Sequence, residues 1–308
     1  MLKRQKKWLQ MAFRVRGSVI PAILPRVLFC TLFSVFIFTL YKLEFPLPTQ
    51  LLENFFIPDL VIGLLLVFRT NTAYDRFWEG RKLWGTLVNT VRNFARQIWV
   101  VILEKTPKDT AEKIKVMRLL VAFAIAVKLH LRGEKINHEV AILTSEEQYN
   151  YLQQMNHPPL EIALWIGDYL QRQQDFKCLN PYQLVSLFKL LDTMVDVLGA
   201  CERIIKTPIP LAYNIHLKQI LLLYCLFIPF QFVDELLGFT GLVTAVISFT
   251  LLGIEEIGQE IENPFGYDNN DLPLDDICKT MLINIEDLIS IHPSVGCPEN
   301  LNSIKSLD

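Results

Sequence analysis

The chain has 308 residues, of which 51% are hydrophobic and 20% are charged. Its mean hydropathy of +0.30 is high for a soluble protein. The composition therefore indicates a membrane part joined to a polar part of similar size. The formal net charge of −2 gives no overall case for nucleic-acid binding.

The residues that usually carry chemistry are scattered. The six cysteines form no CxxC pair, so we expect buried free thiols and no disulfide framework. The five histidines contain no HxxxH pattern, which gives little support for a transition-metal site. We find no glycine-rich phosphate loop and no nucleophile–base motif. An enzyme is therefore not expected.

The N-terminal region predicts a first membrane helix. Residues 1–16 carry basic side chains and no acid, which favours a cytoplasmic N-terminus. A signal peptide is the alternative, but no convincing small-residue cleavage site follows Leu43. We expect the helix over Ser18–Leu43, because a span needs ~20 apolar residues. Arg26 could snorkel to the interface. The basic residues are Lys3, Arg4, Lys6, Lys7, Arg14 and Arg16.

The stretch from Asn54 to Trp84 changes abruptly, at Phe68-Arg69, from apolar to charged and aromatic. Its apolar part, Ile57–Phe68, contains Pro58 and Asp59 and is too short to cross a bilayer. A helix that begins near Leu51 and continues past Arg69 would be long enough. Its second half could not face lipid, because charges at membrane depth face a bundle interior or water.

This second helix is therefore expected to be interior, either as a pore lining or as a buried core helix. Leu60, Leu64 and Phe68 recur at i, i+4 and i+8, which places them on one face. Residues 69–96 hold six basic side chains and two acids, whereas Lys42, Glu44 and Glu53 give the preceding connection no basic excess. The positive-inside rule then places both ends of the first hairpin inside.

Residues 97–207 are expected to form a helical cytosolic domain. Thr106-Pro107 and Asn180-Pro181 are typical helix starts, with Asp109 in the first turn of the former. Leu119–Val127 is apolar but only nine residues long, so a buried soluble helix is favoured over a span. His138–Pro159 is polar and is expected to be loop-like.

Two further spans are expected near the C-terminal end. Thr207–Val233 and Leu236–Ile254 are apolar and are separated by the acidic turn Asp234-Glu235. In the first of them Asn214 and Lys218 share a face, with His216 nearby. Polar groups on one face within a membrane indicate a functional site. The alternative is a lysine that pairs with a helix-end carbonyl or a buried acid.

The segment Glu255–Asp271 is acidic and turns at Asn263-Pro264 and Gly266. Clustered carboxylate and amide oxygens are the ligands that Ca²⁺ prefers, although the spacing is not that of an EF-hand and most acidic loops are simply solvated. We expect Cys297–Asp308 to be a flexible tail.

Three stretches resemble prokaryotic bestrophins. Residues 68–85 (FRTNTAYDRFWEGRKLWG) resemble the signature after the pore helix in this family. Residues 261–266 (IENPFG), with Asp268 and Asp271, resemble its Asn-Pro-Phe-Gly-acidic segment, and Pro208–Leu211 also fits. The three anchors occur in order across nearly the whole chain.

The resemblance implies an all-α membrane protein with four transmembrane helices plus a helical cytosolic domain, assembling as a homopentamer around a central pore. Carried over by position, Leu60, Leu64 and Phe68 fall on the hydrophobic neck of the pore, and Ile209 falls on its cytosolic aperture. The middle neck position is often aromatic or β-branched in the family, whereas leucine stands here. We expect four segments along the chain: 1–96 with the first two spans, 97–207 as the cytosolic domain, 208–257 with the last two spans, and 258–308 as the acidic segment and tail.

The Ca²⁺ clasp of animal members would fall on Glu260, Asn263, Asp268 and Asp271. All four side chains carry oxygen, but Glu260 stands where an amide is expected. Prokaryotic members need not be Ca²⁺-gated, so no cofactor is expected to be required, with Ca²⁺ as the one candidate.

The leading hypothesis is a passive channel for chloride and similar monovalent anions in a multi-pass arrangement, with both termini cytoplasmic. The prokaryotic plasma membrane is the expected location, with the thylakoid membrane as the alternative. A monovalent cation channel of the same fold is the first rival. A secondary anion transporter that uses His216 and Lys218 is the second, although no internal repeat is visible. The expected partners are further copies of the chain, monovalent ions and lipid.

Overall fold

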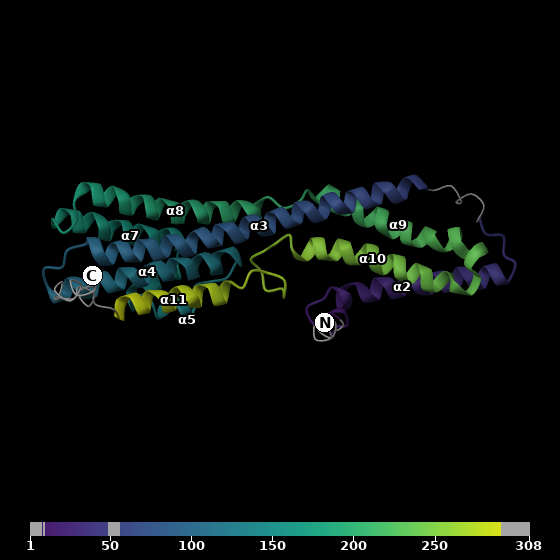
Figure 1. Cartoon of the computed structure of the whole chain (residues 1–308), viewed down its shortest axis with the longest axis horizontal. Coiled ribbons are helices and arrows are strands. Elements are labelled where there is room, and N and C mark those ends of the chain that lie inside the picture. The colour runs from purple at the N-terminus through teal and green to yellow at the C-terminus, as the bar shows by residue number, and fades with distance from the viewer. Residues whose placement is uncertain (1–7, 9, 49–55, 291–308) are drawn as a thin grey trace, which may run out of the picture. The chain divides into compact units, whose positions relative to one another are not determined.

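The computed structural model describes residues 8, 10–48 and 56–290, and every regular element in them is helical (Figure 1). The prediction of an all-α fold is confirmed. Three expectations lie outside the described residues: the basic positions 3–7, a helix start near Leu51, and the tail Cys297–Asp308. Five cysteines in the described part are free and buried, as predicted.

The chain divides into two compact units. Unit 1 comprises Met1–Glu79 and Lys206–Asp271, and unit 2 comprises Gly80–Ile205 and Leu272–Asp308. Helix α3 (Phe56–Val101) is continuous through the division. Unit 2 therefore begins inside this helix, before the expected domain boundary at residue 97, and it also takes in part of the segment that follows the last span.

Unit 1 is built on three apolar helices that pack against one another: α2 (Ile20–Lys42), α9 (Leu211–Leu236) and α10 (Thr240–Glu260). Figure 1 shows α2 and α10 side by side. A side chain at Gly241 would meet Val35 at 3.2 Å, so this glycine permits the close approach of α2 and α10.

The lengths of these helices agree with the expected spans. Two helical stretches are long and apolar enough to cross a membrane: Ile20–Lys42 and Leu211–Glu260, of which the second contains α9 and α10 joined by a 3₁₀ turn. The break between α9 and α10 falls at Leu237, with a φ of 47°, and not at Asp234-Glu235. The two acids remain in the last turn of α9, and the helix after them begins at Thr240 rather than at Leu236.

The first half of α3 adds to the core of unit 1. Ile62 and Leu66 pack with buried residues of α2, α9 and α10. These residues are Ile23, Val27, Leu217, Leu221 and Leu252. The 46-residue helix thus runs without a break across Phe68-Arg69, the position where the sequence changes character.

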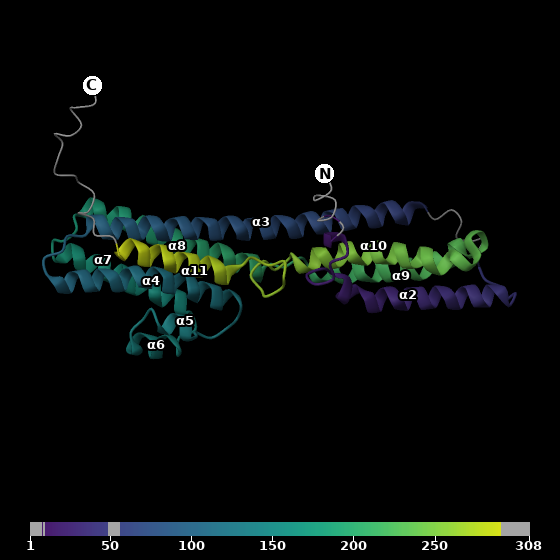
Figure 2. The same ribbon diagram turned by 60° about the horizontal axis from the view of Figure 1, so that its bottom comes forward.

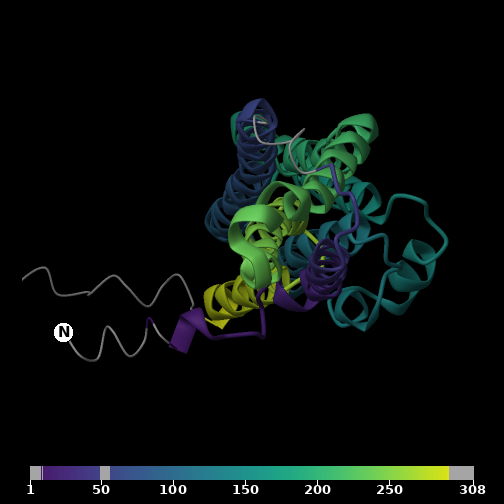
Figure 3. The same ribbon diagram turned by 90° about the vertical axis from the view of Figure 1, so that its right-hand side faces the viewer.

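Unit 2 contains the second half of α3 and four further long helices: α4 (Pro107–Leu131), α7 (Pro158–Asp175), α8 (Pro181–Lys206) and α11 (Leu274–Ser290). Two short helices, α5 (His138–Ala141) and α6 (Glu146–Leu152), occupy the stretch expected to be a loop. Figures 2 and 3 show α5 and α6 set to one side of the long helices of this unit.

The local signals for unit 2 are confirmed. Residues 119–127 are at most 5% exposed, as expected for the core of a soluble domain. The Asp109 carboxylate accepts hydrogen bonds from the backbone N–H groups of Lys105 and Thr106, at 2.9 and 2.8 Å. Asn180 Oδ1 accepts one from the Gln183 N–H at 2.9 Å. These three bonds pair backbone donors at or just before a helix start, where no carbonyl within the helix can accept them.

One charge in the core of unit 2 is fully paired. Lys128 is 2% exposed, and its ammonium group donates to Glu139 at 2.5 Å and to Asp275 at 2.7 Å. Burial acts to lower the pKa of Lys128, but the hydrogen bonds to Asp275 and Glu139 outweigh it and raise that pKa. The two ion pairs tie α4 to α5 through Glu139 and to α11 through Asp275.

Candidate pore-lining site

The three predicted neck residues form an exposed row on α3. In the single chain Leu60 is 76%, Leu64 54% and Phe68 57% exposed. On the other side of the same helix Ile62 and Leu66 are 2% and 3% exposed. In the single chain, one face of the apolar half of α3 therefore packs in unit 1 and the other is open.

Lipid does not account well for this open face. Among the described residues, neither of the two stretches long and apolar enough to cross a membrane includes α3. The same face continues about two and three turns beyond Phe68 with Asp75 and Glu79, which are also exposed. Exposed carboxylates along a helix face meet water or protein and not hydrocarbon. The open row of α3 thus suits a water-filled lumen or another copy of the chain.

A buried ion pair anchors α3 just after the apolar row. Arg69 is 2% exposed, and its guanidinium donates to Glu262 Oε2 at 2.8 Å. Arg76 follows about two turns later on α3. Its Nε donates to the Glu262 carbonyl at 3.1 Å and its Nη1 to the Thr207 carbonyl at 2.5 Å. Glu262 Oε1 also accepts from the Ile209 N–H at 2.9 Å. Glu262 therefore joins α3 to the linker that precedes α9.

Sequence reasoning missed this role of Glu262. The residue lies inside the IENPFG segment but was not assigned a partner. The available signal was the lone arginine at the end of an apolar run, because a buried guanidinium requires a carboxylate. The position of that carboxylate, 193 residues later, could not be read from local pattern.

The predicted aperture residue Ile209 is buried. It is 8% exposed in the single chain, and it lines a cavity of about 360 Å³ together with Phe68, Arg69 and Tyr213. A side chain packed this deeply offers little surface to a shared lumen. Its role at an aperture stays a prediction.

The predicted clasp residues lie around the end of α10 without gathering their carboxylates. Glu260 Oε2 accepts from the Asn270 amide at 2.6 Å, and Asp271 Oδ2 accepts from the Asp268 N–H at 2.8 Å. Asn263 Oδ1 accepts from the Phe265 N–H at 3.3 Å. Among the described residues, the acids of this loop do not form a group of three with ligand atoms within 4.8 Å.

These contacts describe a loop held by its own polar side chains. A Cβ at Gly266 would lie 2.7 Å from Asp271 Oδ2, so the loop closes tightly on this glycine. As arranged, the residues do not fit a Ca²⁺ ion, which takes 6–8 oxygen ligands. The clasp stays a prediction.

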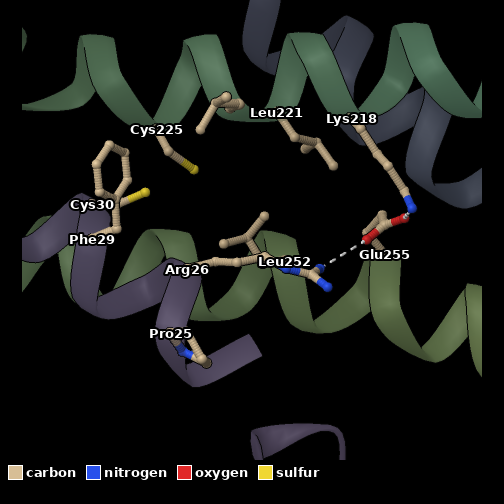
Figure 4. Close-up of a pocket in the computed structure, with 10 residues that line it drawn as sticks. Pro25, Arg26, Phe29, Cys30, Lys218, Leu221, Cys225, Leu252 and Glu255 are labelled. Carbon is tan, nitrogen blue, oxygen red and sulfur yellow. Dashed lines mark ion pairs between the residues drawn. The ribbon is translucent and has the colours of Figure 1, made fainter. Parts of the chain in front are cut away.

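A charged group lies where α2, α9 and α10 meet (Figure 4). Lys218 donates to Gln259 at 2.8 Å and lies 3.8 Å from Glu255, which is 2% exposed. Arg26 pairs with Glu256 at 2.9 Å. Arg26, Lys218 and Glu255 border a cavity of about 550 Å³ whose other lining is apolar. The pairing favours the structural explanation of Lys218, a lysine bound to a buried acid, over a transport site.

The comparisons with known proteins agree across the whole chain. Residues 1–287 match the family model described as bacterial/fungal bestrophin protein. A voltage-dependent anion channel-forming protein of Nostoc sp. strain PCC 7120 is 61% identical over 291 residues, which is 94% of each chain. A protein of the same description from Escherichia coli K12 is 32% identical over 97% of this chain and 96% of its own.

Solved structures give the same result. The crystal structure of a bacterial bestrophin homologue from Klebsiella pneumoniae matches with a TM-score of 0.77 and 31% identity, over 88% of this chain and 100% of that one. A substituted form of that homologue matches with a TM-score of 0.79 and 29% identity, over 87% and 99%.

Proposed function

Because the chain belongs to the bacterial and fungal bestrophin family, we propose that it is a passive membrane channel that conducts chloride and similar monovalent anions. Membership of this family identifies an ion channel and not an enzyme. The relatives from Nostoc and Escherichia coli bear the name of anion channel-forming proteins, which supports the choice of anions. The proposed neck consists of Leu60, Leu64 and Phe68.

One observation carries the proposal for the neck. The row of Leu60, Leu64 and Phe68 is apolar and open. The apolar stretch of α3 that carries it is too short to form a span that faces lipid along its whole length. In a homopentamer, each of the three positions would form a ring of five apolar side chains. A narrow apolar ring gates ions by dewetting and does not bind them, so it discriminates weakly among ions of one sign.

The sign of the ion must then be selected elsewhere along the pore. Helix N-termini favour anions. Asp75 and Glu79 continue the same face of α3 and are exposed, and acidic rings favour cations. A monovalent cation channel of the same fold is therefore the second candidate function, supported by this specific placement of two carboxylates.

The first experiment measures the reversal potential of the purified protein in a planar bilayer under a KCl gradient. A shift toward the chloride equilibrium potential is expected. A shift toward the potassium potential would keep the pore but overturn the proposed anion selectivity. In that case neutralisation by Asp75→Asn and Glu79→Gln should reduce the preference for potassium.

A second experiment tests the neck. Leu60→Ala, Leu64→Ala and Phe68→Ala combined should raise the current several-fold, because a wider and less apolar constriction is hydrated more easily. The matched control is Leu32→Ala on α2, where the leucine is 68% exposed on a helix suited to face lipid. This control should leave the current unchanged. A normally assembled triple variant with wild-type current would remove these residues from the neck.

We place the channel in the prokaryotic plasma membrane, with the thylakoid membrane as the alternative and both termini on the cytoplasmic side. The helices α2, α9 and α10 and the first half of α3 would supply the four spans. Accessibility of single cysteines introduced at Lys105 and at Lys42 to a membrane-impermeant thiol reagent tests the orientation. Labelling of the Lys105 position from outside intact cells would contradict it.

A further inference from the structure

Unit 2 contains a cluster of two histidines and one glutamate from three helices. His130 lies near the end of α4, His157 immediately precedes α7, and Glu202 lies near the end of α8. His130 Nε2 is 2.7 Å and His157 Nε2 is 2.8 Å from the same oxygen, Glu202 Oε1. The two imidazole rings are 4.5 Å apart between centroids.

This arrangement is distinctive in the molecule. Within the described residues, it is the one group of three or more His, Cys, Asp or Glu side chains whose ligand atoms all lie within 4.8 Å of one another. The positions are 130, 157 and 202, too far apart in sequence for any spacing motif. The absence of HxxxH therefore did not exclude a site assembled by the fold.

The chemistry of the three groups suits a transition metal. Two imidazole nitrogens and one carboxylate oxygen are a common ligand set for Zn²⁺, which leaves a fourth position for water. Ligand atoms of a tetrahedral zinc site lie ~3.3 Å apart for bonds of ~2.0 Å. The observed separations of 2.7 and 2.8 Å are slightly shorter, so small outward rotations of the side chains would admit an ion.

The cluster is also reachable from solvent. The side chains of His130, His157 and Glu202 are 24%, 37% and 17% exposed, so the site is neither sealed nor loosely placed on the surface. A cavity of about 360 Å³ adjoins it, lined by His130 and by Pro158 and further by polar residues. The polar lining residues are Glu134, Lys135, Gln153 and Asn156.

We propose that His130, His157 and Glu202 bind one divalent transition-metal ion of the zinc class per chain, cross-linking α4, α7 and α8. Binding requires the Nε2 lone pairs, so each ring must carry its proton on Nδ1. His157 Nδ1 is buried without a hydrogen-bond partner. A buried Nδ1–H without an acceptor would weaken metal binding, and the site is open to solvent. Both features indicate an exchangeable ion that a chelator removes, unlike a permanent structural zinc.

The test uses the full-length, tag-free protein in detergent, stripped with EDTA and then titrated with ZnCl₂ by calorimetry. Wild-type protein should bind one Zn²⁺ per chain at this site and should gain thermal stability on binding. CoCl₂ should give the intense visible absorption of a low-coordinate nitrogen–oxygen site. The proposal does not depend on the ion that the channel conducts.

Glu202→Gln is the decisive variant. Its amide oxygen can still accept a hydrogen bond from an imidazole, so the packing is preserved, but an amide is a poor zinc ligand. Zinc affinity should fall at least tenfold, and the zinc-dependent rise in melting temperature should disappear. The control is His216→Asn, which removes an exposed histidine of α9 outside the cluster and should leave both unchanged.

Circular dichroism and the melting temperature in EDTA verify that Glu202→Gln is folded like the wild type. His157→Asn provides a second variant, because the His157 side chain makes no capping hydrogen bond to α7. Equal zinc affinity in the wild type and in both variants would overturn the proposal. A wild type without any zinc-dependent thermal shift would overturn it as well.

Discussion

The two halves of α3 use apolar residues at helical spacing in opposite ways. In unit 2, residues on one stripe of the helix are all 0% exposed; they are Trp84, Leu87, Val91, Phe94 and Ile98. In unit 1, Leu60, Leu64 and Phe68 are at least 54% exposed. The first stripe alternates steps of three and four residues, as in helices that pack closely on neighbours, whereas the second repeats every four.

This difference shows that apolar periodicity alone does not separate a buried core face from an open face such as the one proposed to line the pore. Both stripes would be read as buried faces in a soluble protein. What distinguishes them is the surrounding sequence. The row in unit 1 runs into exposed carboxylates, whereas the stripe in unit 2 is covered by other helices. Substitutions in the two halves should therefore act on different properties, stability in one and conduction in the other.

The largest expected effect on stability contrasts Phe94→Ala with Leu64→Ala. Phe94 is 0% exposed, and its truncation should cost about 3–5 kcal/mol, because a cavity remains in unit 2. Leu64 is 54% exposed, so its truncation should cost well under half as much in the single chain. Thermal unfolding in detergent, followed by circular dichroism, measures both. Similar losses in the two variants would show that the row on α3 is packed after all.

The next effect concerns Arg69, the buried charge that follows the apolar row of α3. Arg69→Ala leaves Glu262 without its buried partner and should cost about 3 kcal/mol, because breaking a buried ion pair strands a charge. Arg69→Met combined with Glu262→Gln should recover part of the loss, because no unpaired charge remains. Melting temperatures of the two variants provide the comparison. A double variant less stable than Arg69→Ala would contradict the explanation.

The smallest effect is a pH dependence confined to unit 2. Burial tends to raise the pKa of Asp275, but hydrogen bonds from Lys128 and Arg132 outweigh it and lower that pKa. The unfolded state then binds more protons in acid. The contribution of Asp275 to the free energy of unfolding is therefore fully present above the ordinary aspartate pKa of ~3.9. It is lost as pH falls through the lower pKa of the folded state.

Asp275→Asn should accordingly make the free energy of unfolding fall less steeply in acid. The difference from the wild type should be less than about 1 kcal/mol, because the Asp275 side chain is 57% exposed and screened by solvent. The control is Asp276→Asn on the next residue of α11, which is also exposed. Melting temperatures between neutral and acidic pH measure the slope. Identical slopes in wild type and Asp275→Asn would contradict the prediction.

Local signals in the sequence predicted much of this fold. The caps at Thr106 and Asn180 were visible because a helix start satisfies its donors with residues three or four positions away. The first span was visible because its length and composition are set by the bilayer. The change of character at Phe68-Arg69 indicated one long helix with an unusual environment.

Pairings over long distances could not be predicted in the same way. The partners Arg69 and Glu262 are 193 residues apart, and the sequence shows only that each needs an opposite charge. The cluster of His130, His157 and Glu202 depends on the packing of three helices. Ile209 was assigned from family resemblance, and neither its burial nor the hydrogen bond from its N–H follows from the proline-rich linker around it.

The pairing of Arg26 with Glu256 has a consequence for how the protein is made. The two residues are 230 positions apart, with Arg26 in the first apolar helix to leave the ribosome and Glu256 in the last. During synthesis Arg26 therefore has no Glu256 carboxylate to pair with until α10 has been inserted. Chains that stall before α10 would keep an uncompensated arginine and an open α2 face.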